Sequence, residues 1–152
     1  MITNERQYRI TRAEATKLRE ALETAVEGGP AEGVHPRIHQ AIQDGLESQL
    51  HELDANLNDY EALRSGRVRE RTFHDLNGLL TALIEARIAA GLTQRDLGER
   101  LNLAEQQIQR YEATGYAGVS IDRIQQIADT LQLQIEERVT YSIPVESGTL
   151  TD

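Results

Sequence analysis

The stretch that decides the fold is Leu92–Glu112, LTQRDLGERLNLAEQQIQRYE, which reads as two short helices joined by a tight turn. Thr93 and Asp96 have the spacing of a capping box, in which each side chain bonds to the backbone amide of the other residue at a helix start. Asn102 tolerates the left-handed backbone conformation that a sharp turn between helices requires. These features predict a helix-turn-helix.

The second helix of this motif is predicted to bury one face and to expose the other. Leu103, Ile108 and Tyr111 fall on the inner face. In the first helix, Gly98 has no side chain and leaves room for its neighbour to approach closely. The outer face then consists of polar side chains suited to reading base edges, namely Glu105, Gln106, Gln107, Gln109 and Arg110.

Spacings within residues 76–133 resemble those of the Xre family, the phage-repressor-like helix-turn-helix proteins. The matching segments are ARxxAGLTQ at 86–94, LxxRLxL at 97–103 and IxRYE at 108–112, followed by a closing amphipathic helix. The resemblance implies a lambda-repressor-like domain that places its second helix in the major groove of double-stranded DNA.

Given that docking, the side-chain chemistry suggests a role for each candidate residue. Gln106 can present a hydrogen-bond donor and an acceptor to adenine, and Arg110 can make two parallel hydrogen bonds to guanine. Glu105 can accept a hydrogen bond from cytosine or repel phosphate. The alternative for each is ordinary polarity of an exposed helix. Residues expected to contact phosphate and set the register are Thr93, Gln94 and Arg95, and secondary candidates for DNA contact are Gln107, Gln109 and Tyr116.

Two further positions concern stability rather than sequence reading. Arg87 and Glu112 match positions that form a structural ion pair in similar family members, so the resemblance implies the same pair here. Ala104 departs from the family pattern, because it stands where Ser or Thr usually caps the second helix. We therefore expect a secure fold but a weakened phosphate contact at this helix start.

The composition limits the functional classes. The chain has 152 residues, no cysteine, and no apolar run of membrane-spanning length, so we expect no disulfide, no thiolate chemistry, no membrane partner and a cytoplasmic location. The net charge of −9 conflicts with a simple DNA-binding surface. All but one of the 16 basic residues are Arg, which pairs well with phosphate and guanine, so local contacts remain available.

Residues 1–66 are predicted to form an N-terminal helical region for dimerisation or partner binding. A TRAE capping pattern starts a helix at Thr11, which runs to about Glu27, and a second helix runs from Pro36 to about Arg64. The second helix carries a seam with coiled-coil spacing, formed by Leu46, Leu50, Leu53, Leu57 and Tyr60. The seam predicts either a helical hairpin within the chain or a coiled coil between two chains.

Residues 67–133 are predicted to form the helix-turn-helix DNA-binding domain. It opens with a basic linker, RVRER, that either contacts the DNA backbone or is simply solvated. A helix from about Phe73 or Asp75 to Ala90 is expected to bury Leu76 among other apolar residues, and a closing helix follows Ser120. Apolar alternation from Leu133 onward predicts a C-terminal β-strand at 134–146, and 147–152 form a tail.

Catalytic and metal-binding constellations are weak. His35 with His39 and Glu47 with His51 are spaced to share a helix face, but no strong third ligand accompanies either pair. We therefore predict no metal, no cofactor and no enzyme activity. The expected fold is mostly α, with an N-terminal helical hairpin or coiled coil, a lambda-repressor-like helix-turn-helix domain and a C-terminal β-strand.

A single helix-turn-helix reads few base pairs, so the function we expect is a sequence-specific, homodimeric repressor. The acidic N-terminal helices and the predicted strand resemble the partner-binding parts of Xre-type antitoxins in type II toxin-antitoxin modules. That resemblance implies an autoregulating antitoxin with a cognate toxin protein as a partner. The alternatives are an ordinary regulator of other genes and a protein-interaction scaffold with little DNA binding.

Overall fold

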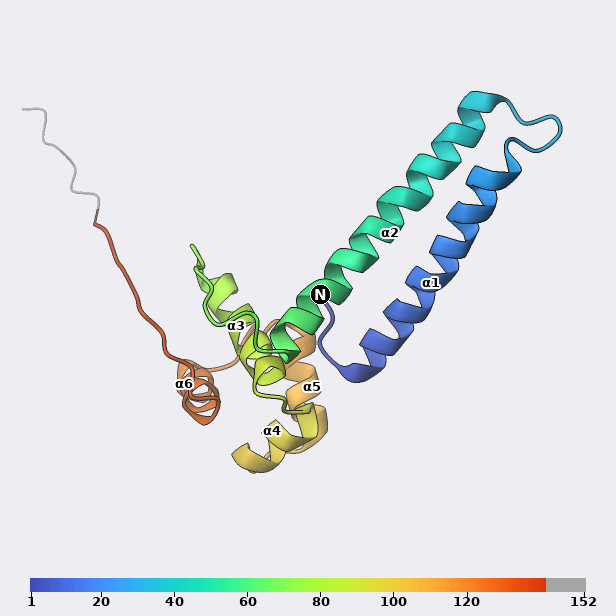
Figure 1. The fold of residues 1–152 in the computed structure, drawn as a ribbon. Coiled ribbons are helices and arrows are strands. Elements are labelled where there is room, and N and C mark those ends of the chain that lie inside the picture. The colour runs from blue at the N-terminus through green and yellow to red at the C-terminus, as the bar shows by residue number, and fades with distance from the viewer. Residues whose placement is uncertain (142–152) are drawn as a thin grey trace, which may run out of the picture.

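The fold consists of a long helical hairpin attached to a small helical body (Figure 1). The computed structural model describes residues 1–141, and all regular structure in this range is α-helical. The hairpin is formed by α1 (Glu5–Gly28) and α2 (Pro36–Arg64). The body is formed by α3 (Leu76–Ala89), α4 (Gln94–Leu101), α5 (Glu105–Ala113) and α6 (Ile121–Thr130). The mostly α class is as predicted.

The first helix begins earlier than the sequence suggested. We predicted a start at Thr11, but α1 begins at Glu5, after Asn4, whose side chain accepts a hydrogen bond from the Gln7 amide at 2.9 Å. The Gln7 side chain in turn accepts one from the Thr3 amide at 2.8 Å. Asn4 therefore satisfies one free amide of the first turn and Gln7 satisfies the amide of Thr3 just before it, which leaves the TRAE pattern inside the helix.

The two long helices pair within the chain along their whole length. At the base of the hairpin, the rings of Tyr8 and Tyr60 stack with centroids 5.2 Å apart. Near the middle, Arg19 forms a salt bridge with Asp54 at 3.0 Å. Near the tip, the side-chain amide of Gln43 donates to the Ala25 carbonyl at 3.1 Å. Of the two arrangements that the seam left open, the structure contains the hairpin within one chain.

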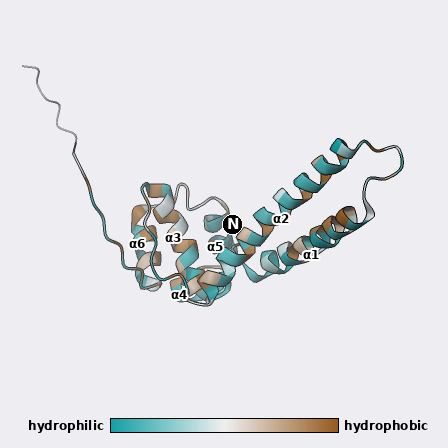
Figure 2. Cartoon of the chain, turned by 45° about the horizontal axis from the view of Figure 1, so that its top comes forward, coloured by the Kyte–Doolittle hydropathy of each residue, from teal (hydrophilic) through white to brown (hydrophobic). Residues whose placement is uncertain are grey.

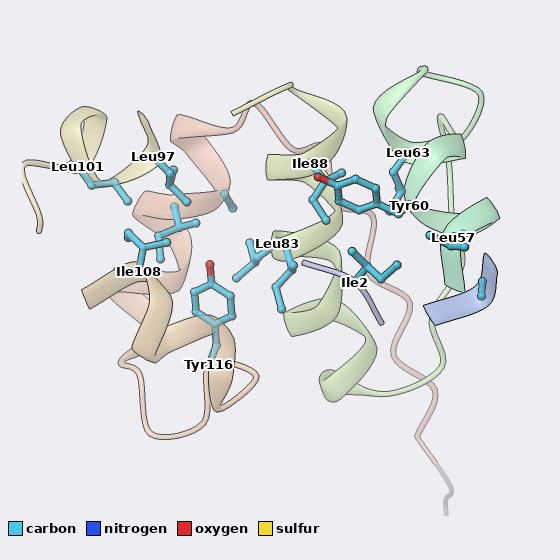
Figure 3. Packing of buried hydrophobic residues seen from close by; sticks show 14 residues of the cluster. Ile2, Leu57, Tyr60, Leu63, Leu83, Ile88, Leu97, Leu101, Ile108 and Tyr116 are labelled. Atoms are coloured by element: carbon cyan, nitrogen blue, oxygen red, sulfur yellow. The ribbon is translucent and has the colours of Figure 1, made fainter. Parts of the chain in front are cut away.

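The predicted seam is buried only at the base of the hairpin. Leu57 and Tyr60 are buried, whereas Leu46, Leu50 and Leu53 are only partly covered. The base is buried because the body covers this end of α2, where Tyr60 and Leu63 pack into the same buried cluster as the body residues (Figure 3). Ile2 is part of this cluster, so the residues before α1 join the hairpin to the body.

The core of the body takes one fully buried aliphatic side chain from each of its four helices. These are Ile127 of α6 and, labelled in Figure 3, Leu83 of α3, Leu97 of α4 and Ile108 of α5. Leu76 is a correction, since we predicted it to be buried and it is 79% exposed. It occupies the first turn of α3, directly after the cap residue Asp75, where no other element covers it.

The predicted C-terminal β-strand was wrong over the residues that the structure describes. Residues 134–141 have no regular structure and run away from the body (Figure 1), and residues 142–146 of the prediction lie outside the described range. Alternating apolar residues suit a strand, but a strand also requires neighbouring backbone groups to pair with. The body is entirely helical within residues 1–141 and offers no sheet edge.

No helix among the described residues combines the length and the apolar character needed to cross a membrane.

The start of α1 can be tested by two alanine substitutions. Asn4→Ala removes the side chain that caps α1 and is expected to lower the free energy of unfolding by about 1 kcal/mol in urea denaturation. Thr11→Ala, at the start that the sequence suggested, should change it by less than about 0.5 kcal/mol, because Thr11 lies inside the helix. The opposite ranking of the two variants would contradict the observed helix start.

Candidate nucleic-acid interface

Both ends of α4 are fixed by local contacts. The Thr93 hydroxyl accepts a hydrogen bond from the Asp96 amide at 3.0 Å, and the Asp96 carboxylate accepts one from the Thr93 amide at 2.8 Å. The Thr93 side chain and the Thr93 backbone amide, which both hydrogen-bond the Asp96 carboxylate, hold the pKa of Asp96 below its usual range. At the other end of α4, Asn102 has the left-handed conformation with φ 55° and ψ 43°. The predicted capping box and turn are confirmed.

Gly98 allows α5 to start directly beside α4. A Cβ atom at this position would lie 2.7 Å from the carbonyl oxygen of Leu103, which is closer than any side chain tolerates. The Leu103 amide donates to the Gly98 carbonyl at 2.8 Å, so the two backbones are in direct contact. The angle between the two helices is therefore set by backbone packing and does not depend on flexible side chains.

The first turn of α5 has no side-chain cap. Ala104 occupies the cap position with an extended backbone and makes no side-chain hydrogen bond. The backbone amides of Glu105 and Gln106 are therefore available to an anionic group, as at other helix starts, while the Gln107 amide donates to the Ala104 carbonyl at 2.9 Å. The missing side-chain cap that the sequence predicts at Ala104 is confirmed.

The exposed face of α5 carries the residues predicted to read bases. Gln106, Gln109 and Arg110 are exposed, while Glu105 and Gln107 are half-buried. Among the described residues, neither Gln106 nor Arg110 has a side-chain hydrogen bond, so both side chains are free to engage a ligand. This face is the most direct candidate for contact with base edges.

Glu105 connects two of the other candidates. Its carboxylate lies 3.4 Å from the Arg95 guanidinium of α4 and accepts a hydrogen bond from the side-chain amide of Gln109 at 3.2 Å. Arg95 is thereby drawn to the edge of α5, and Glu105 partly balances its charge. A phosphate contact by Arg95 requires it to exchange Glu105 for phosphate, while Thr93 stays exposed beside it.

Gln94 and Tyr116 do not present their side chains to solvent in the way the sequence suggested. The Gln94 amide donates to the Glu112 carboxylate at 2.7 Å, so its side chain turns inward. Tyr116 is a correction, because it is only 1% exposed and cannot reach DNA. Its backbone is left-handed with φ 62°, which turns the ring into the core (Figure 3), and its ring centroid lies 6.0 Å from that of Tyr111. Burial raises the pKa of the Tyr116 hydroxyl.

Arg87 lies buried at the centre of a polar network. Its guanidinium forms a paired contact with the Glu112 carboxylate, with Nε 2.5 Å from Oε1 and Nη2 2.8 Å from Oε2. It also donates to the carbonyl oxygens of Leu92 at 2.8 Å and Thr3 at 2.6 Å. Arg87 thus connects the end of α5, the start of α4 and the segment before α1. Sequence reasoning missed Thr3, which lies 84 positions away and carries no local signal.

The basic linker is only partly available to a ligand. Arg71 lies 3.0 Å from Glu85 of α3 and 4.0 Å from Asp59 of α2, so its charge joins the hairpin to the body. Burial raises the pKa of Glu85 in spite of Arg71. The Arg67 guanidinium donates to the Ser65 hydroxyl at 3.1 Å, and Arg69 is exposed.

Comparison with known proteins identifies the same part of the chain. Residues 83–138 match a family described as helix-turn-helix. No curated protein and no solved structure matched the chain significantly. The matched residues comprise most of the body, including α4, the turn and α5. This part of the chain is a helix-turn-helix domain, the kind with which transcription regulators bind double-stranded DNA.

The structural role of Arg87 can be tested by removing it. Arg87→Ala leaves the Glu112 carboxylate buried without its main partner and is expected to lower the free energy of unfolding by about 3 kcal/mol in chemical denaturation. Arg100→Ala serves as the control, because Arg100 is exposed on α4 and should cost less than about 0.5 kcal/mol. A loss below about 0.5 kcal/mol for Arg87→Ala would contradict the role assigned to the pair.

Proposed function

We propose that this protein is a sequence-specific transcription repressor that binds DNA as a homodimer. The observation that carries the proposal is the exposed polar face of α5, held at a fixed angle by the backbone contact between Gly98 and Leu103. A helix of this kind fits the major groove, and a second copy binds the second half-site, about one helical turn away along the DNA. The role is binding, with no catalytic step.

Within this proposal, Arg110 and Gln106 read bases and the start of α4 sets the register. Arg110 makes two parallel hydrogen bonds to guanine, and Gln106 makes a matching pair to adenine. Thr93 and the backbone amide of Gln94 approach a phosphate at the start of α4. Glu105 accepts from cytosine or holds Arg95 and Gln109 in place.

The acidic charge of the chain is expected to lower its affinity for DNA. With a net charge of −9, the protein gains little from general attraction to phosphate and depends on a few well-placed arginines. One domain then binds weakly, and two linked domains are needed for useful occupancy of a site. We expect binding that decreases steeply as the salt concentration rises.

Base reading can be tested after the preferred site has been obtained by selection from random double-stranded DNA at low salt. Arg110→Ala and Gln106→Ala are each expected to weaken binding to that site by about 10- to 100-fold and to relax the preference at one position of each half-site. Arg37→Ala removes a positive charge near the hairpin tip and serves as the matched control. Fluorescence anisotropy titrations measure both effects.

Two results would overturn parts of this proposal. Unchanged affinity and preference in Arg110→Ala would refute Arg110 as the reading residue. Absence of any binding to double-stranded DNA at low salt would refute the repressor and favour an interaction scaffold that retains a helix-turn-helix domain.

A more specific candidate is an antitoxin that neutralises a cognate toxin and represses its own operon. The segment after α6 supports it, because Val139 and Tyr141 are 68% and 83% exposed on a stretch without regular structure. Exposed apolar side chains on a segment without regular structure suit docking to another protein, which covers them on binding.

The antitoxin role predicts a protein partner held through this segment. The tagged full chain, expressed together with the genes that adjoin its own, is expected to co-purify with one of their products in a stable complex. Replacing Ile135, Val139 and Tyr141 by Asp should abolish the complex, whereas Leu76→Asp, at an equally exposed apolar residue of the body, should leave it intact. A partner that is retained by the triple variant would contradict docking through this segment.

A further inference from the structure

An uncharged stripe runs along one side of α2 from the tip of the hairpin toward the body. It consists of Ile38, Ile42, Leu46, Gln49 and Leu53, which follow one another at spacings of three or four residues and therefore share one side of the helix. We call this set the α2 stripe. The same spacing leads on through Asn56 to Tyr60 and Leu63, which are buried where the body covers α2.

The α2 stripe is uncovered over its outer part. Ile38 is 57% exposed and Ile42 is 50% exposed, and Leu46 and Leu53 are only partly covered. The stripe extends over about 24 Å of helix. Figure 2 shows apolar residues along both helices of the hairpin, which projects from the body without any covering element.

Two helices alone do not bury the apolar side chains that the hairpin brings together. No residue from 16 to 56 is buried, and Leu18 and Leu22 of α1 are only partly covered. Long helices gain most of their stability from packing of an apolar face, and a bundle of four helices supplies the cover that a pair lacks. The outer hairpin therefore requires a partner.

The distribution of charge favours a second copy of this chain as that partner. The helix α2 carries six acidic residues, and none of them belongs to the α2 stripe. In a symmetric dimer the same surface meets itself, so acidic residues on it would lie against the acidic surface of the other copy and be repelled. The uncharged stripe is the side on which two acidic hairpins approach each other without that cost.

We infer that the α2 stripes of two copies pack against each other and form a four-helix bundle from two hairpins. The inference rests on the proposed function in one respect, since a homodimeric repressor needs such an interface. It adds the surface, and this surface differs from the full predicted seam, whose inner part, Leu57 and Tyr60, is already buried within the chain. The two DNA-binding domains are then attached to one shared four-helix bundle.

The test is sedimentation equilibrium of the full chain without DNA. The natural chain is expected to be dimeric at about 10 µM, and the double variant Ile38→Glu/Ile42→Glu should raise the dissociation constant by at least about 100-fold. Circular dichroism shows whether the variant keeps its helices, and Ile38→Leu/Ile42→Leu should remain dimeric. The matched control Leu76→Glu/Ile121→Glu makes the same charge change at two exposed apolar residues of the body and should also remain dimeric.

The outcomes separate this inference from the proposed function. A dimer that the stripe substitutions do not weaken overturns the inference and leaves the homodimeric repressor standing. A monomeric natural chain at about 100 µM overturns both the inference and the homodimer. A dimer that depends on the stripe but binds no double-stranded DNA supports the inference and refutes the repressor.

Discussion

The buried guanidinium of Arg87 is the constraint on which the rest of the structure depends. It neutralises Glu112 and at the same time satisfies the carbonyl oxygens of Leu92 and Thr3. A buried carboxylate without such a partner is strongly unfavourable, so the end of α5, the start of α4 and the segment before α1 have to meet at one point. The exposed face of α5 is thereby held in a fixed relation to both the body and the hairpin.

The local features of the helix-turn-helix could be predicted from the sequence because each has a local cause. Thr93 and Asp96 satisfy each other's amides, Asn102 accepts a left-handed turn, and Gly98 admits a neighbouring backbone. The same holds for α2, whose observed limits, Pro36 and Arg64, are those that were predicted. In all of these cases the residues that decide the structure lie within a few positions of one another.

The errors came from causes that are not local. Tyr116 occupies a glycine-rich loop and carries a polar hydroxyl, but the core beneath the loop accepts the whole ring, and a positive φ turns it inward. The predicted strand had the right alternation and lacked a neighbour to pair with. The α1 start is the exception, because its cause is local: Asn4 with Gln7 three residues later is itself a capping pattern, and the prediction took the later TRAE pattern instead.

The burial of Ile2 and the bond from Arg87 to Thr3 also affect the order in which the protein folds. Residues 2 and 3 are synthesised well before Arg87, their partner 84 positions later, so the first segment has to remain unpaired while the hairpin forms. Contacts of such long sequence separation are slow to close. The helical body therefore depends on residues that lie far from it in the sequence, and a fragment that starts at the linker lacks the contacts of Ile2 and Thr3.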